Sequence, residues 1–317
     1  MRFPLADWID DHAGCRHDLG RSGMVGSVTH PRPTLRQIRD ASASELVDQL
    51  AAGLGVDPGR VFLTPGATEA NAWVTLFRAR RSRGRTPRLR VRFPEYPPLV
   101  DVATWAGFRL ERSADRAELA VVSLPRNPEG VLWSDDELGG WAEGARSVLI
   151  DETFREFSGA PSKASAGRPG VWASGTFTKF YAADDIRVGY AVAPPEEAAS
   201  FARFHGLVTD ELSPYSVASA LRLLRGGRSV VRRVRHLFEA NRSALARALP
   251  LERMVQAPVY FDRVPDGDRL ARQCLRASVL VCPGSYFGSP GGVRITLTRP
   301  TFARDLAAYL QVRFRTV

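Results

Sequence analysis

Lysine is the rarest cationic residue in this chain. Of its 44 basic side chains, 42 are arginines, and only Lys163 and Lys179 are lysines. A lysine amine can lose its proton and add to a carbonyl carbon, whereas a guanidinium stays protonated and cannot. The two lysines are therefore the first candidates for covalent chemistry. Lys163 lies in a polar stretch flanked by Gly and Pro (GAPSKASAGRPG), which is typical of a loop charge.

Lys179 lies at the end of an apolar segment, within Thr-Phe-Thr-Lys. Spacing alone leaves two interpretations open, a solvated lysine at a strand end or a reactive amine. The motifs elsewhere in the chain favour the reactive amine.

Four short motifs appear in an order that suits a phosphorylated pyridine cofactor. Gly66, Ala67 and Thr68 lie between a predicted strand and a helix start, where backbone amides and a hydroxyl can hold a phosphate. Asn127 follows the strand-like AVVSLP, and its amide can donate to a phenolic oxygen, although Asn-Pro-Glu-Gly taken alone favours an ordinary turn.

The third and fourth motifs supply a carboxylate and the amine. Asp151 ends the strand-like SVLI, where it can pair with a pyridinium nitrogen and so make the ring an electron sink. Lys179 can form a Schiff base with an aldehyde, and Thr176, Thr178 and Arg187 can complete a phosphate cup.

The segments that would position these residues alternate short apolar runs with amphipathic helices, which is the pattern of an α/β domain. A helix is predicted over 44–54, with Ser44 as its N-cap and Gly55 as its stop, and a second helix begins at Thr68. Beyond residue 195 the pattern changes to long helices, followed by strand, helix, strand and helix over 255–317. The predicted strands are 61–63, 89–93, 119–124, 148–151, 171–177 and 188–192, and a long helix is predicted near 228–248.

Composition describes a globular chain of 317 residues, 44% hydrophobic and 25% charged. The sequence lacks an apolar run long enough for a membrane span, and acids interrupt the N-terminus, so we expect a cytoplasmic protein without a membrane partner. Cys15, Cys274 and Cys282 have no metal-ligand spacing and are expected to be free thiols without a metal. The net charge of +10 and the arginines of 77–85 suit nucleic acid, but arginine is spread over the whole chain, which favours a solvated surface and no nucleic-acid partner.

Taken as an ordered set, the motifs resemble those of the fold-type I pyridoxal-phosphate (PLP) enzymes of aminotransferase class I/II. Within these, the chain is similar to the branch of histidinol-phosphate aminotransferase and threonine-phosphate decarboxylase over roughly residues 40–300. The resemblance implies an α/β fold with a mostly parallel central sheet, helices on both of its faces, and a smaller α+β C-terminal domain. The implied parts are an N-terminal segment, 1–35, that packs on the small domain, a large PLP-binding domain, 36–215, and a small C-terminal domain, 216–317.

The resemblance also implies a role for each motif residue. Lys179 would form the Schiff base and Asp151 would bind the pyridine nitrogen, so that these two are the catalytic residues. Asn127 would bond the ring oxygen, Tyr96 of PEYPP would stack on the ring, and Arg294 of GGVRITLTR would clamp the substrate α-carboxylate with its planar fork. The phosphate would be held by Gly66, Ala67, Thr68, Thr176, Thr178 and Arg187. A homodimer is implied as well.

Four positions depart from the family pattern. Phe154 stands where relatives carry a tyrosine that bonds the ring oxygen, and no tyrosine precedes Tyr96 to reach a neighbouring subunit. Asp185 replaces a glycine near Arg187, which is unfavourable beside a phosphate unless a cation neutralises it. The Asn-rich substrate segment of many relatives is missing, and 14–28 shows no evident replacement.

The leading functional hypothesis is an aminotransferase that moves an amino group between an amino acid and a keto acid, both small molecules, through Lys179. The alternative is an α-decarboxylase of a phosphorylated amino acid, which Phe154 and the TKFYA run favour. A third possibility is a catalytically idle PLP-binding protein, against which the retention of Lys179 argues. Other PLP chemistry, such as cyclisation or oxidation, stays open, and the residues do not identify the amino acid.

Overall fold

The computed structural model describes residues 3–316 except 25, 83 and 112–116. Its largest sheet has seven strands in the order β2-β8-β7-β6-β5-β3-β4. Strand β8 is antiparallel to both of its neighbours, and the other pairs that join β7 to β4 are parallel. The mostly parallel sheet that the sequence predicts is therefore confirmed. The strands are β2 (Val61–Thr64), β3 (Arg88–Val91), β4 (Arg109–Glu111), β5 (Leu119–Ser123), β6 (Val148–Asp151), β7 (Val171–Thr176) and β8 (Gly189–Val192).

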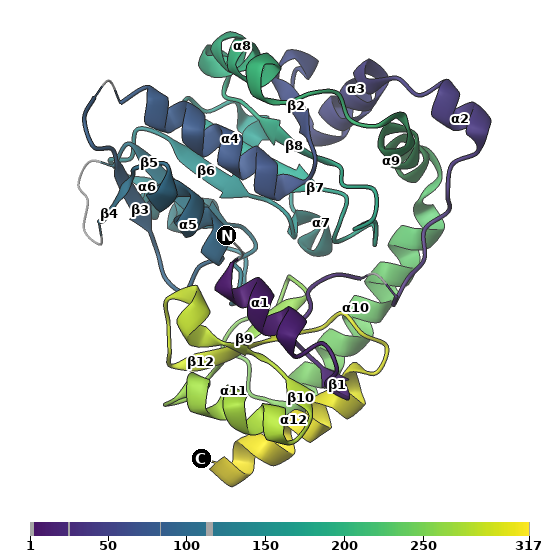
Figure 1. The fold of residues 1–317 in the computed structure, drawn as a ribbon, viewed down its shortest axis with the longest axis vertical. Helices are drawn as coiled ribbons and strands as arrows, with labels where there is room; N and C mark the ends of the chain where they lie inside the picture. Colours follow the sequence, from purple (N-terminus) through teal and green to yellow (C-terminus); the bar gives the residue numbers. More distant parts are fainter. Residues whose placement is uncertain (1–2, 25, 83, 112–116, 317) are drawn as a thin grey trace.

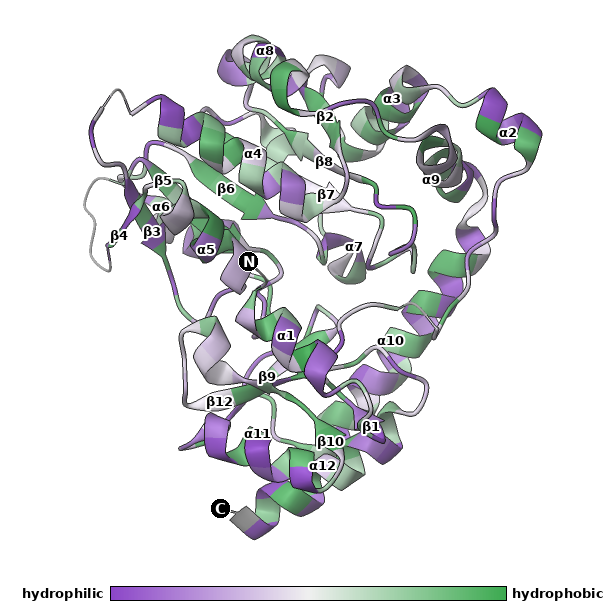
Figure 2. Cartoon of the chain, viewed as in Figure 1, coloured by the Kyte–Doolittle hydropathy of each residue, from purple (hydrophilic) through white to green (hydrophobic). Residues whose placement is uncertain are grey.

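Helices cover both faces of this sheet, as Figure 1 shows. Alternate residues of β5 point to opposite faces: Leu119 and Val121 join an apolar cluster with α4, α5 and α8, whereas Ala120 and Val122 join a cluster with α6. Because both faces are covered, β5 and β6 are buried along their whole length and apolar up to the polar residues that end them, Ser123 and Asp151. Figure 2 shows β6 green, apart from its purple end. These helices are α4 (Ala67–Arg80), α5 (Pro97–Trp105), α6 (Asp135–Ala142) and α8 (Ala198–Val208).

A second layer of strands and helices lies at the other end of the molecule in Figure 1, and α10 runs toward it from the seven-stranded sheet. Its antiparallel sheet has the order β11-β12-β9. The N-terminal β1 pairs with β10, far away in the sequence, in parallel register. The elements of this layer are α10 (Arg228–Ala248), β9 (Val259–Arg263), α11 (Gly267–Arg276), β10 (Val279–Leu280), β11 (Cys282–Pro283), β12 (Gly292–Thr296), α12 (Phe302–Thr316), α1 (Pro4–Asp11) and β1 (His17–Asp18). Helix α9 (Pro214–Gly226), which precedes α10, lies at the opposite end of the molecule from this layer, beside α2 (Leu35–Arg39) and α3 (Ala43–Leu54).

The predicted element bounds are close to the observed ones, with one wrong cap. Strand β6 and helix α10 have the predicted bounds. Helix α3 (Ala43–Leu54) is capped by Ser42, whose side chain accepts a hydrogen bond from the Glu45 amide; the predicted cap, Ser44, already lies inside the helix. Gly55 ends the helix in the left-handed conformation, as expected. The remaining elements are α2 (Leu35–Arg39), α7 (Arg155–Ser158) and four short 3₁₀ helices, η1 (Pro58–Arg60), η2 (Lys163–Ala166), η3 (Pro195–Glu197) and η4 (Gly284–Phe287).

Three further expectations concern the cysteines, the membrane and the arginine run. Cys15, Cys274 and Cys282 carry free thiols, as expected. None of the helices in the described ranges is long and apolar enough to cross a membrane. In the arginine run, Arg80 and Arg81 are exposed at the end of α4, but Arg78 is buried in an ion pair with Glu197. The domain divisions at 35 and 215 stay a prediction.

Candidate active site

A cavity of about 200 Å³ lies at the carboxyl ends of the parallel strands, and the predicted residues meet there. The chain reaches it from five strand ends, because Gly66 follows β2, Tyr96 follows β3, Asn127 follows β5, Asp151 ends β6 and Thr176 ends β7. All eleven residues expected around the cofactor line this cavity: Gly66, Ala67, Thr68, Tyr96, Asn127, Asp151, Phe154, Thr176, Thr178, Lys179 and Arg187.

Asp151 is held in place by two donors. Asn71 Nδ2 donates to Asp151 Oδ2 at 2.9 Å, and the Thr153 amide donates to Oδ1 at 2.9 Å. Ser174 Oγ donates in turn to Asn71 Oδ1 at 2.6 Å, which fixes the orientation of the amide. Burial raises the pKa of Asp151, and the hydrogen bonds from Thr153 and Asn71 and the charge of Lys179 oppose that rise. A cation in the cavity would favour the charged carboxylate further.

Lys179 is the lysine that faces the cavity, and its side chain stays 26% exposed. Burial lowers the pKa of its amine, and Arg294 and Arg187 lower it further, while Asp184 and Asp151 raise it. Its Nζ lies 3.9 Å from Asp184 Oδ1. A lowered pKa increases the fraction of neutral, nucleophilic amine at physiological pH.

Lys163 has a different environment. It lies on η2, and its Nζ forms an ion pair with Asp135 Oδ1 at 2.5 Å. It is not among the residues that line the cavity. The structure therefore separates the two lysines as the sequence predicted.

The turn before α4 forms a cradle that fits a phosphate. Gly66 has φ +106°, and a Cβ there would lie 2.9 Å from Arg187 Nη2, so a side chain would fill the space between the turn and the guanidinium. The first-turn amides of the 14-residue helix α4 point toward this space with the positive end of the helix dipole. Arg187 is exposed and donates to the Pro65 carbonyl at 3.2 Å.

Two threonines and a tyrosine complete this side of the cavity. Thr176 Oγ1 donates to the Val188 carbonyl at 2.9 Å and accepts from the Thr178 amide at 3.2 Å. A hydrogen bond to the Thr68 side chain favours the charged form of Tyr96, but burial still raises the pKa of its phenol. Tyr96 therefore stays neutral, with its ring on the cavity wall.

Arg294 is 2% exposed and lies beside the cavity, not on its lining. Its Nη2 donates to the Gly20 carbonyl at 2.7 Å, and its Nη1 lies 3.4 Å from Asn127 Oδ1. Its predicted role as the ligand of the substrate α-carboxylate stays a prediction. Its Nε is buried and has no partner among the described residues, which leaves one donor free for an acceptor.

The sequence of 14–28 showed no evident replacement for the Asn-rich substrate segment of many relatives. In the structure, part of this N-terminal stretch lies at the cavity. The Leu19 carbonyl accepts from the Thr296 amide at 2.9 Å, and Gly20 is bound to Arg294. Ser22 then reaches the cavity lining. A Cβ at Gly23 would lie 2.4 Å from Asp184 Oδ2, so glycine lets the segment pass this close.

Two departures from the family pattern have a structural explanation. Asp185, which seemed unfavourable beside a phosphate, is 50% exposed and bonds His30 Nε2 at 2.7 Å. Phe154 lines the cavity from the start of α7, and its ring lies 6.2 Å from that of Phe157. The phenylalanine at position 154 has no hydroxyl, so this residue cannot donate a hydrogen bond into the cavity.

Several residues of the site were not predicted from the sequence. Ser22, Ser123, Pro125 and Thr153 also line the cavity, and Asn71 binds Asp151 from α4. Asn71 lies four residues after Ala67 on the buried face of α4, but Thr75 and Arg78 are buried on the same face, so the sequence pattern did not single out Asn71. Ser22 is distant in the sequence from the other residues that line the cavity, so no local sequence pattern indicates its place there.

Comparison with known proteins agrees with the geometry. Residues 35–308 match the model of the family described as aminotransferase class I and II. Histidinol-phosphate aminotransferase of Symbiobacterium thermophilum is 28% identical over 201 residues, which is 60% of this chain and 55% of that protein. Capreomycidine synthase of Streptomyces vinaceus is 26% identical over 360 aligned positions, which cover 96% of this chain and 92% of that protein.

A solved aspartate aminotransferase from Thermus thermophilus, with maleate, has a TM-score of 0.81 and 19% identity over 100% of this chain and 97% of that chain. This likeness confirms the predicted fold-type I α/β architecture. The chain spans from 53% to 60% of the length of the first curated relatives that it matches. Because the family model covers most of the chain, the protein belongs to the aminotransferase class I and II family.

Proposed function

We propose that this chain is a PLP-dependent aminotransferase that moves an amino group between an amino acid and a keto acid, with Lys179 as the covalent anchor. The observation that carries the proposal is the single cavity that joins Lys179, Asp151 and the cradle at Gly66. When bound, PLP supplies an electron sink for the electron pair released at the substrate Cα. Family membership supports the same cofactor.

In this proposal the phosphate lies against Gly66, Ala67 and Thr68, and the Arg187 guanidinium neutralises its charge. Thr176 and Thr178 add hydroxyl groups at the same end of the cavity. His30 supports the arrangement indirectly, because its contact with Asp185 turns that carboxylate toward the N-terminal segment.

The ring end of the cavity has its own set of contacts. Asp151 would keep the ring nitrogen protonated, and the hydrogen bonds from Asn71 and Thr153 favour the charged form of the carboxylate that this requires. Asn127 donates to the ring oxygen, and its own amide oxygen faces Arg294. Tyr96 stacks on the ring, and Phe154 fills the remaining wall without donating a hydrogen bond.

Lys179 also moves the proton. With the cofactor and an amino acid bound, Lys179 Nζ would be the base that accepts the proton from the substrate Cα. The lowered pKa of this amine supports that role, because a neutral amine is needed as the base. Arg294 binds the substrate α-carboxylate, for which its unpartnered Nε is the available donor.

We further propose a homodimer in the cytoplasm, with an amino acid and a keto acid as its small-molecule substrates. The division into 1–35, 36–215 and 216–317 is part of the same proposal. Pairing of β1 with β10 supports the assignment of the N-terminal segment to the C-terminal layer.

A reaction other than amino transfer on the same cofactor is the second candidate. Capreomycidine synthase, the relative whose match covers 96% of this chain, is named as a synthase and not as an aminotransferase. The cavity residues would bind PLP in either case, so product analysis has to separate the two.

The test is an incubation of the pure, PLP-loaded protein with a panel of amino acids and 2-oxoglutarate. Keto acid, glutamate and carbon dioxide are measured together, with Lys179→Ala as the blank. We expect keto acid and glutamate in equal amounts without carbon dioxide. Carbon dioxide release, or a product formed without glutamate, would contradict amino transfer.

A further inference from the structure

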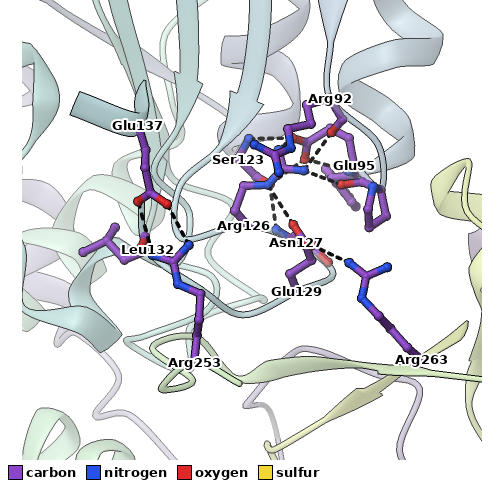
Figure 3. A network of polar contacts seen from close by, with 12 residues as sticks. Arg92, Glu95, Ser123, Arg126, Asn127, Glu129, Leu132, Glu137, Arg253 and Arg263 are labelled. Carbon is purple, nitrogen blue, oxygen red and sulfur yellow. Dashed lines mark hydrogen bonds and ion pairs between the residues drawn. The ribbon is translucent and has the colours of Figure 1, made fainter. Parts of the chain in front are cut away.

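A buried ion pair joins two loops behind the cavity (Figure 3). Glu95 follows β3 and Arg126 follows the neighbouring strand β5. Arg126 Nη1 lies 2.6 Å from Glu95 Oε2, and both side chains are 0% exposed. Neither residue is among those that line the cavity. A pair of charges so deeply buried is costly unless its remaining donors and acceptors are satisfied.

Among the described residues, the other hydrogen bonds to the Glu95 carboxylate come from Tyr96 and Ser123, which both line the cavity. The Tyr96 amide donates to Oε1 at 2.7 Å. Ser123 donates twice, from its hydroxyl to Oε1 at 2.5 Å and from its amide to Oε2 at 3.1 Å. Burial raises the pKa of Glu95 to about 7, and Arg126 is the first of the groups that oppose this rise.

Arg126 uses all three of its nitrogen atoms. Nη2 donates to the carbonyls of Arg92 at 2.7 Å and Pro94 at 2.6 Å, which lie in the loop that carries Glu95. Nε donates to Glu129 at 3.1 Å, and the guanidinium lies 4.7 Å from the centre of the Trp133 ring. The arginine therefore holds both loops in one arrangement.

Ser123 extends the network to Asn127. The backbone amide of Asn127 donates to Ser123 Oγ at 2.7 Å, so a chain of hydrogen bonds runs from Asn127 through the serine hydroxyl to Glu95. Glu129 also accepts from Arg263 on β9 at 3.1 Å, which connects the loop to the C-terminal layer. Figure 3 shows this continuous path.

We propose that Glu95 and Arg126 are positioning residues of the active site, whose ion pair fixes Tyr96, Ser123 and Asn127 relative to one another and so sets how tightly, and in which protonation state, the site holds PLP. The inference rests on the proposed function. Neither residue touches the cofactor in this account, and both act through the residues that they hold.

The chain offers a matched control. Arg78 and Glu197 form another buried ion pair, with Arg78 Nη1 2.5 Å from Glu197 Oε1 and side chains that are 3% and 12% exposed. Arg78 lies on the C-terminal half of α4 and Glu197 on η3, and neither lines the cavity. A loss of stability that comes only from an unpaired buried charge should appear in both pairs.

The experiment compares wild type with Glu95→Gln, Ser123→Ala, the double variant of these two, and Glu197→Gln. Three quantities are measured in each: the Kd for PLP by absorbance titration, the pH midpoint of the bound cofactor's absorbance, and the Tm without cofactor. Glu95→Gln should bind PLP at least about tenfold more weakly, which is the scale of one charge-assisted hydrogen bond. Glu197→Gln should lower the Tm but keep the wild-type Kd and pH midpoint.

Ser123→Ala tests the connection without leaving an unpaired charge. Its pH midpoint should rise, because Asn127 no longer keeps its position as the donor to the ring oxygen. The double variant should shift the midpoint no further than the larger of the single shifts, since both changes break one chain of hydrogen bonds.

The outcomes separate this inference from the proposed function. A wild-type protein that binds no PLP would refute the proposed function itself. If wild type binds PLP and both Glu95→Gln and Ser123→Ala keep its Kd and midpoint, the ion pair is structural only and the inference is wrong. Should Glu95→Gln fail to fold, an unchanged midpoint in Ser123→Ala would be enough to overturn it.

Discussion

Asn71 Nδ2 lies 2.9 Å from Asp151 Oδ2, which makes a helix residue the direct partner of the carboxylate at the end of β6. The contact joins α4, which begins at the phosphate cradle, to the ring end of the cavity. Because Ser174 Oγ fixes the Asn71 amide, the carboxylate accepts a donor of defined orientation. Helix α4 therefore serves both ends of the cofactor site.

Replacement of Asp151 should abolish most of the activity without loss of the cofactor. An amide in Asp151→Asn cannot hold the ring nitrogen protonated, so we expect turnover at least about a hundredfold slower, the scale of a lost electrostatic stabiliser. Asn71→Ala should have a smaller effect in the same direction, about tenfold, because the carboxylate remains but loses one donor. Steady-state kinetics of PLP-loaded protein provide the measurement.

A control for stability is available on α10. Asn241 is also buried and donates to the Leu297 and Arg299 carbonyls, away from the cavity. Asn241→Ala should reduce the Tm but not the turnover number. Equal turnover in Asn71→Ala and wild type would show that the Asn71 contact has no part in the reaction.

The pKa of Lys179 provides a prediction with a definite sign. Burial, Arg294 and Arg187 lower it, so the rate of PLP capture by cofactor-free protein should rise with pH around a midpoint below 10.5, the ordinary value for lysine. Asp184 raises the pKa, because its carboxylate favours the ammonium form. Asp184→Asn should therefore shift the midpoint to lower pH, and Arg187→Gln should shift it to higher pH. Opposite shifts would mean that these charges do not act on Lys179.

Arg294→Lys tests the carboxylate site. The variant keeps the charge but loses the planar fork, so amino-acid binding should weaken by about ten- to a hundredfold, as expected for lost hydrogen bonds to a charged group. The absorbance of the bound cofactor should not change. Arg276→Lys, at an exposed position on α11, is the control and should bind the amino acid normally. Unchanged affinity in Arg294→Lys would move the carboxylate site elsewhere.

The sequence predicted the sheet and the cavity better than it predicted what surrounds them. Strands such as β5 and β6 are buried on both faces, so their uninterrupted apolar runs are readable without a structure. The cavity residues follow those strands directly, and a parallel sheet brings its carboxyl ends together. The position of these residues directly after the strands was enough to predict that they meet in one cavity.

The missed contacts join segments that are distant in the sequence. Arg294 donates a hydrogen bond to the Gly20 carbonyl, and Asp185 forms a hydrogen bond with His30. The pair of Glu95 and Arg126 depends on the adjacency of β3 and β5, which no local pattern reveals. Burial of a charge is set by such contacts, and hence the sequence alone did not reveal that Arg294 is buried.

Phe154→Tyr should change the protonation of the bound cofactor. A tyrosine hydroxyl at this cavity position would donate to the ring oxygen and stabilise its deprotonated form, so the pH midpoint of the cofactor absorbance should fall. The neighbouring Phe157→Tyr is the control, because Phe157 packs against Phe180 and Phe238 and is not a cavity residue. An unchanged or raised midpoint in folded Phe154→Tyr would show that residue 154 does not contact the ring oxygen.

The covalent anchor is the central claim, and reduction of the loaded protein tests it most directly. Borohydride converts a Schiff base to a stable secondary amine, and peptide mass analysis then identifies the lysine that carries the pyridoxyl phosphate. We predict that Lys179 carries the label, that Lys179→Ala is folded but unlabelled and inactive, and that Lys163→Ala is labelled and active. Label on Lys163, or an active Lys179→Ala protein, would contradict the account.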